Sequence, residues 1–235
     1  MNPAIIKSCV LSSFLAATAL LIPVSYAETD PWPAISPAGL HRATFSRLSV
    51  VYLAPNVDLG IYNEIMLMEP VVRFRKNREG TEISEGHGLD ASPEVILAVR
   101  KKMASEFRKV FAEKLENGGY DIVQKEAFDV LLVRPAIINL EVSFPEDAES
   151  SDVEAIVRSA GELTLFLEAF DSVTGEVLAR GMDLKETTDM GGDGAGLVFF
   201  RSDLEPEKDQ ALIDYAFNDW ADSLVKSLNE ARAHR

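Results

Sequence analysis

Residues 162–186 read ELTLFLEAFDSVTGEVLARGMDLKE, and this stretch decides the fold. In its first part the polar residues Thr164 and Glu168 alternate with leucines, which is the two-residue period of a strand with one buried and one more polar face. The segment 171–175 ends in Gly175, where a hairpin loop needs a left-handed residue. The stretch therefore predicts two strands, 162–170 and 176–186, joined as a hairpin.

More strands are predicted on the N-terminal side of this hairpin. The longest of them alternates in the same way, with Asn139 set between Ile138 and Leu140. Another contains Pro70, which predicts a bulge or an edge position because proline cannot donate a hydrogen bond to a neighbouring strand. These β-type segments are 49–53, 64–75, 120–123 and 130–142.

Two segments carry apolar residues at helical spacing. The first is capped by Ser92, has Pro93 at its first helical position, and stops at Gly118. The second runs from about residue 206 to residue 231 and presents one broad apolar stripe that includes Trp220. Both patterns predict helices that bury one side.

The elements follow the order β-β-α-β-β-β-β-α, without the regular alternation of strand and helix that a parallel sheet requires. We therefore predict an α+β fold, in which a largely antiparallel β-sheet packs against two long α-helices. The stretches between these elements are polar, acidic or glycine-rich and are predicted to be loops: 76–92, 145–160 and 187–204.

The N-terminal 27 residues have the layout of a cleavable signal peptide. Lys7 supplies a positive charge, an apolar run follows, and Pro23 ends it. Small residues stand at Ser25 and Ala27, so the expected cut lies between Ala27 and Glu28. A membrane anchor is the alternative, but the run is shorter than the ~20 apolar residues that cross a bilayer.

Cys9 is the only cysteine of the chain, and it stands before the apolar run rather than after it. Lipid attachment to a signal-peptide cysteine needs the opposite arrangement. The sequence therefore predicts a periplasmic protein that is not a lipoprotein, with secretion beyond the periplasm left open. Its mature chain has no thiol, and hence neither a disulfide nor a cysteine metal site.

Behind the signal peptide we predict a proline-rich extended lead-in at 28–48 and a single α+β domain at 49–235. The formal net charge of the whole chain is −15 at pH 7. A surface this acidic repels phosphate, so nucleic acid is not an expected partner. No later apolar run predicts a transmembrane segment after signal cleavage.

The sequence offers little for catalysis or for holding a cofactor. Its three histidines show no metal-ligand spacing, and no motif pairs a nucleophile with a base. We therefore predict no catalytic residue, no metal site and no cofactor. The alternative is a hydrolase that acts on an envelope polymer through carboxylates of the predicted loops, such as Asp90, Asp189 or Asp193.

One local feature runs against the acidic composition. Four cations crowd into six residues at the end of the second predicted strand: Arg73, Arg75, Lys76 and Arg78. Guanidinium groups bind carboxylates and phosphates through paired hydrogen bonds, so this basic cluster is a candidate anion site or docking patch. The competing interpretation is that the cluster pairs with acids of the same chain, such as those at 145–154.

Several blocks occur in a fixed order along the chain: YNEIMLMEPV at 62–71, DVLLVRPAI at 129–137, GELTL at 161–165, DSVTGEVLAR at 171–180 and WA at 220–221. In this order they resemble a family of bacterial envelope proteins known as domain of unknown function 3313. The resemblance implies a secreted or envelope-associated α+β domain and implies no activity. Many members look like lipoproteins, a feature that this sequence lacks.

These inferences lead to one functional hypothesis. We expect an exported, non-enzymatic periplasmic domain that binds a partner or ligand in the bacterial cell envelope. An envelope protein or an anionic small ligand would suit the basic cluster.

Overall fold

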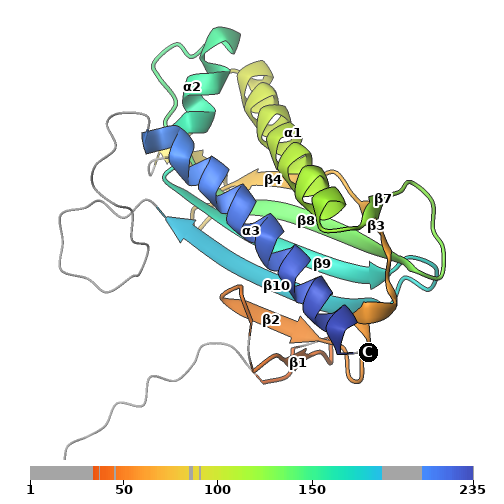
Figure 1. Cartoon of the computed structure of the whole chain (residues 1–235). Helices are drawn as coiled ribbons and strands as arrows, with labels where there is room; N and C mark the ends of the chain where they lie inside the picture. Colours follow the sequence, from red (N-terminus) through yellow and green to blue (C-terminus); the bar gives the residue numbers. More distant parts are fainter. Residues whose placement is uncertain are drawn as a thin grey trace, which may run out of the picture. The chain divides into compact units, whose positions relative to one another are not determined.

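The computed structural model describes residues 34–186, except 37, 45, 85, 86 and 90, and residues 208–234 (Figure 1). All of them belong to one compact unit, Trp32–Arg235. None of the described helices combines the length and apolar character that crossing a membrane requires.

Eight strands of the described residues form one sheet: β1 (His41–Arg42), β2 (Val50–Leu53), β3 (Glu64–Leu67), β4 (Val71–Phe74), β7 (Asp121–Ile122), β8 (Val130–Glu141), β9 (Glu162–Asp171) and β10 (Val177–Glu186). Their spatial order is β1-β2-β10-β9-β8-β3-β7, and β4 also pairs with β8. The pairs β1–β2, β2–β10, β10–β9 and β9–β8 are antiparallel. Strands β3 and β4 pair with β8, and β7 pairs with β3, in parallel orientation. The predicted hairpin is confirmed, and the sheet as a whole is mixed.

The predicted strand at 64–75 is two strands rather than one. β3 pairs with the first residues of β8 and β4 with its later part, so both lie along the same twelve-residue strand. Pro70 stands between them and is buried. Because proline has no N–H to donate, the ladder is interrupted there and resumes at Val71.

The first predicted helix is confirmed as α1 (Pro93–Asn117). The hydroxyl oxygen of Ser92 accepts a hydrogen bond from the backbone nitrogen of Val95 at 3.3 Å, which caps the first turn. The chain leaves the helix at Gly118. Its buried side chains recur at helical spacing: Val95, Val99, Met103, Phe107, Phe111 and Leu115.

The predicted number and order of elements are wrong in two loops. The segment 145–160 contains a 3-10 turn, η2 (Ser150–Asp152), and a third helix, α2 (Val153–Arg158), because Ile156 and Val157 are buried in the core beside α1. The segment 76–92 contains a small hairpin of β5 (Ile83–Ser84) and β6 (His87–Gly88). The predicted helix at about 206–231 is confirmed over its described part as α3 (Lys208–Ala233), whereas residues 206 and 207 lie outside the described residues.

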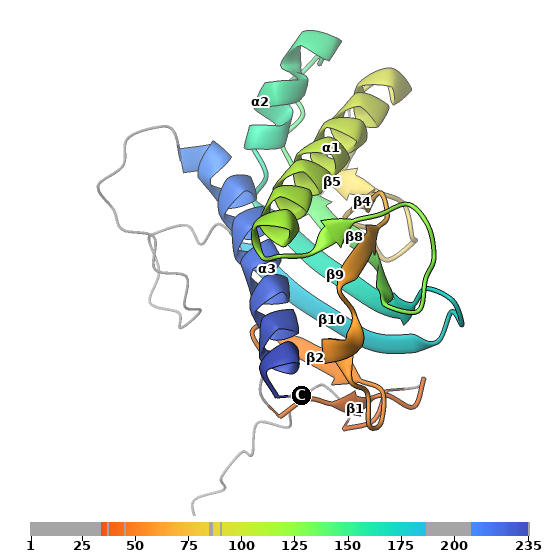
Figure 2. The ribbon, with the colours of Figure 1, turned by 45° about the vertical axis from the view of Figure 1, so that its right-hand side comes forward.

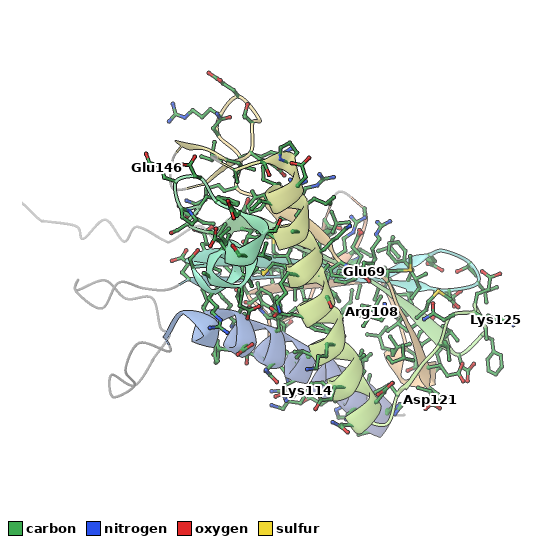
Figure 3. All side chains as sticks on the ribbon, turned by 90° about the horizontal axis from the view of Figure 1, so that it is seen from above. Glu69, Arg108, Lys114, Asp121, Lys125 and Glu146 are labelled. Atoms are coloured by element: carbon green, nitrogen blue, oxygen red, sulfur yellow. The ribbon has the colours of Figure 1, made fainter. Side chains whose placement is uncertain are left out.

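Helices α1 and α3 pack on one face of the sheet, with β8, β9 and β10 behind them (Figures 1 and 2). The main core lies in this layer and includes leucines of β9 and the aromatic residues Phe107, Phe111, Phe217 and Trp220. Polar contacts also hold α1 in place (Figure 3). Arg108 Nη1 donates to the carbonyl oxygen of Leu67 at 2.7 Å, and Lys114 Nζ lies 3.0 Å from Asp222 Oδ1 of α3.

Part of the segment predicted as an extended lead-in joins the sheet. β1 pairs with β2, and an isolated bridge joins Ile35 to His41. A short 3-10 turn, η1 (Leu59–Ile61), follows β2. Leu40, Val50 and Tyr52 form a second, small core, against which Met182 packs.

Candidate functional site

The face of the sheet opposite α1 and α3 carries no described helix, and we call it the helix-free face. Side chains alternate between the faces, so the register assigns each residue to one of them. Lys185 reaches Asp219 of α3, so its neighbour Leu184 lies on the helix-free face. The same parity, followed across the paired strands, places Glu168, Arg134 and Arg180 there.

The centre of this face is a row of three charged residues that we call the Glu168 triad: Arg134 of β8, Glu168 of β9 and Arg180 of β10. The register aligns them directly across three neighbouring strands. Glu168 accepts hydrogen bonds from Arg134 Nε at 3.0 Å, from Arg134 Nη2, and from Arg180 Nε at 2.8 Å. Its side chain is only 7% exposed, so both of its oxygens are used by the two guanidinium groups.

Apolar rows flank the Glu168 triad on both sides. On one side the register aligns Val71, Ala136, Phe166 and Met182, and on the other Met66, Leu132 and Phe170. The guanidinium carbon of Arg134 lies 4.8 Å from the centre of the Phe170 ring, a cation–π contact that joins the triad to its neighbouring row.

Three large apolar side chains of this face are well exposed. Met68 is 43% exposed, Val71 47% and Leu184 44%. Met68 and Val71 are close in the sequence, and the sheet brings the distant Leu184 of β10 to the same face. Large exposed apolar patches on a soluble domain mark interaction surfaces more often than scattered single residues do.

The basic cluster predicted from the sequence is divided by the structure. Arg75 Nη1 lies 2.9 Å from Glu141 Oε2, and Arg75 Nη2 pairs with Glu162. The hydrogen bond to Glu162 and the charges of Glu162, Glu141 and Glu186 raise the pKa of Arg75, so this cation is held by the protein's own acids. These acids stand on β8, β9 and β10, not in the segment 145–154.

The other three cations of the cluster have a different environment. Arg73, Lys76 and Arg78 are exposed, and none makes an ion pair with a residue in the described part of the chain. Val72 and Phe74 are buried on the helix side, which turns Arg73 of β4 toward the helix-free face. Arg73 therefore places a positive charge at the β4 side of that face, and we call Arg73 together with the exposed cations Lys76 and Arg78, which follow β4, the positive border.

The loop carboxylates of the hydrolase hypothesis, Asp90, Asp189 and Asp193, lie outside the described residues. Among the residues that are described, no three His, Asp or Glu side chains gather as metal ligands would. A depression is lined by residues of α1, α2 and α3, including Glu106, Val157 and Ile213. Its volume of about 10 Å³ has room for a single water molecule.

The Glu168 triad could not be predicted from the sequence. Each member occupies a polar position in an alternating strand, and that alternation was the available signal. It shows which side of a strand a residue is on, but it does not show which residue of the next strand stands opposite. That information resides in the register, which pairs residues 34 and 12 positions apart in the chain.

Two solved structures are similar to this chain at low sequence identity. The PelC L103M dodecamer from Paraburkholderia phytofirmans is 12% identical, with a TM-score of 0.34, and the match covers 72% of this chain and 94% of that chain. Protein XCC0632 from Xanthomonas campestris is 9% identical, with a TM-score of 0.38, and the match covers 81% of this chain and 97% of that chain. Among curated proteins there is no match.

The sequence of the described domain matches one protein family. The matched residues, 35–198, include the sheet from β1 to β10 together with α1 and α2. They also contain the whole Glu168 triad and the basic cluster. The match confirms the resemblance seen in the sequence: the chain belongs to the family described as "Protein of unknown function (DUF3313)".

Proposed function

We propose that this protein is an exported binding domain of the bacterial cell envelope, which holds a partner protein on its helix-free face and catalyses no reaction. One observation carries the proposal: Met68, Val71 and Leu184 expose apolar surface on a sheet face that no described helix covers. The signal-peptide layout of residues 1–27 supports export to the periplasm.

The chemistry of this face suits a protein partner. Methionine, phenylalanine and arginine are enriched in protein interfaces, and all three are present in the rows around Glu168. Because Glu168 already pairs with Arg134 and Arg180, a partner that covers the triad buries one net positive charge rather than three separate charges. Burying an isolated charge would cost far more free energy.

The positive border favours a partner that carries negative charge. Arg73, Lys76 and Arg78 are exposed cations in a chain with a net charge of −15. A partner that presents carboxylate or phosphate groups at this border gains charge-assisted hydrogen bonds. An anionic small ligand that binds here without a protein partner is the other occupant that this chemistry allows.

A pull-down from periplasm tests the proposal, with the mature protein as bait. Val71→Asp combined with Leu184→Asp places charge at two exposed apolar positions of the helix-free face, and we expect the specific partner to be lost. The matched control is Leu97→Asp, a change on α1 at a residue with a similar exposed fraction of 49%. It should retain the partner, and all variants should keep the melting temperature of the parent protein.

A second set of variants examines the border. Charge reversal of Arg73, Lys76 and Arg78 to glutamate should weaken capture, and the weakening should be larger at low salt. The proposal is wrong if the apolar and the charge-reversal variants both retain every partner of the parent protein. Turnover of an envelope glycan or peptide by the purified protein would also contradict it.

A further inference from the structure

A second exposed surface lies at one end of the sheet, away from the Glu168 triad. The segment 123–129, between β7 and β8, and the segment 171–176, between β9 and β10, lie side by side there in both ribbon views (Figures 1 and 2). We call these two segments together the Phe128 tip.

Hydrogen bonds hold the two segments of the Phe128 tip together. The hydroxyl oxygen of Ser172 accepts from Ala127 N at 3.2 Å and donates to Ala127 O at 2.9 Å. Ser172 N also donates to Val130 O at 3.3 Å. The backbone on either side of Phe128 is thus tied to the opposite segment, which fixes the place from which its side chain emerges.

The hairpin side of the tip is rigid for a separate reason. Asp171 Oδ1 accepts hydrogen bonds from Val173 N at 3.0 Å and from Thr174 N at 2.7 Å, an arrangement that closes a tight turn. Gly175 follows with φ of 70°, a conformation that glycine adopts without strain. The neighbours of Val173 are therefore fixed.

This rigid frame exposes two apolar side chains. Phe128 is 82% exposed and Val173 is 58% exposed. Phe128 follows Ala127 and Val173 follows Ser172, the two residues that these hydrogen bonds join. Among the large apolar residues that the structure describes, Phe128 has the highest exposed fraction. An aromatic side chain on a preorganised backbone loses little conformational entropy on binding and commonly anchors an interface.

Negative charge surrounds the apolar pair. The two segments contain Glu126, Asp129, Asp171 and Glu176 against the single cation Lys125. Burial, the hydrogen bond to Asp171, and the charges of Asp171, Glu176 and Asp58 all raise the pKa of the nearby Tyr62 hydroxyl. Asp171 and Glu176 of the tip therefore lie close enough to act on the Tyr62 hydroxyl, and Asp58 adds a third carboxylate beside the tip.

We propose that the Phe128 tip is a second protein-binding surface, and that its partner is a folded protein with an apolar pocket bordered by lysine or arginine. The apolar pair defines the pocket, and the surrounding carboxylates define its border by charge complementarity. A lipid surface fits poorly, because anionic headgroups repel this tip. A second copy of the chain has a net charge of −15, so long-range repulsion opposes its approach, and the cross-linking below tests it directly.

Site-specific photocross-linking in the full exported chain tests this proposal. Phe128, and in a second protein Val173, is replaced by the photoreactive amino acid benzoylphenylalanine, and Leu97 on α1 serves as the control position. We expect the same protein to be cross-linked from positions 128 and 173 but not from position 97. The cross-linked peptide, mapped by mass spectrometry, should lie on a surface rich in lysine and arginine.

Charge dependence gives the proposal a second readout. Because the border interaction is electrostatic, the cross-linked product should fall severalfold between ~50 and ~500 mM NaCl. It should fall similarly in a Glu126→Lys, Glu176→Lys variant, whose changed residues are both exposed and leave Phe128 in place. The melting temperature of each variant confirms that it is folded.

Several outcomes overturn the proposal. They are equal labelling from positions 97 and 128, no protein product from position 128, cross-links to a second copy of this chain, and cross-links that salt and charge reversal do not change. Sedimentation with vesicles of phosphatidylethanolamine and phosphatidylglycerol that depends on Phe128 would assign the tip to a membrane instead. The tip adjoins the Phe170 end of the helix-free face. The two proposals are tested at different residues, Phe128 and Val173 here and Val71 and Leu184 there, so each proposal can fail without the other.

Discussion

Glu168 shows how a single residue can depend on strands that are distant in sequence. Its carboxylate is buried, and it is compensated only because Arg134 and Arg180 stand opposite it on the two neighbouring strands. A buried carboxylate without such partners would be strongly destabilising. The position therefore constrains the register of the whole central sheet.

Substitution of this residue has a measurable cost. Glu168→Gln removes the charge and leaves one oxygen to serve two guanidinium groups, so we expect the free energy of unfolding to fall by roughly 1–3 kcal/mol. The lower part of that range reflects the partial exposure of both arginines. Urea denaturation measures the change, and Glu79→Gln, at an exposed position, is the control. Equal stabilities of the two variants would contradict a structural role for the triad.

At the scale of elements, the ends of helices were the easiest features to predict. Ser92 acts through its side chain on the first turn, and Pro93 and Gly118 act through their own backbone, so the observed bounds of α1 follow from local sequence. The six-residue helix α2 was missed because so short a segment has little intrinsic helix stability. It forms where Ile156 and Val157 are buried in the core.

The contact between α1 and α3 yields a prediction about Gly118. A Cβ atom at this position would lie 2.6 Å from Val225 Cγ1 of α3, whereas the φ of Gly118, −78°, suits any residue. We therefore expect Gly118→Ala to lower the free energy of unfolding by roughly 1–3 kcal/mol through crowding alone. Val225→Ala in the same chain should restore part of this loss, and a double-mutant cycle by urea denaturation measures the coupling. Strict additivity of the two changes would show that the helices do not meet there.

At the scale of the whole molecule, a polar centre joins distant parts of the chain. Asp183 of β10 accepts from Trp220 Nε1 of α3 at 2.8 Å and from the backbone nitrogen of Ser49 at 2.9 Å. Lys185 Nζ lies 3.0 Å from Asp183 and 2.9 Å from Asp219. Although burial lowers the pKa of Lys185, its two carboxylate partners raise it by more, so the lysine remains charged.

The pH dependence of stability is a further property of the whole molecule. Hydrogen bonds from Thr174, Tyr62 and Val173 lower the pKa of Asp171 below its ordinary value of 3.8. Since the folded-state pKa is the lower one, Asp171 stabilises the fold above pH 3.8, and this contribution disappears as the pH falls through the folded-state pKa. The difference in urea midpoint between the parent protein and Asp171→Asn should thus be largest near neutral pH and shrink in acid. A difference that stays constant with pH would contradict this assignment.

The features that the sequence determined by itself depend on residues that are close to one another in the chain. The cap, proline and glycine of α1 and the alternation on both sides of Gly175 act between near neighbours, and the family is recognisable from short blocks in order. The tertiary structure decided what local interactions cannot: the parallel pairing of β3 and β4 with β8, and Arg75 paired with Glu141 and Glu162. The tertiary structure also brought together the three residues of the Glu168 triad. Strand register is set by burial and lateral hydrogen bonding over the whole sheet, and only then do residues far apart in the chain become one surface.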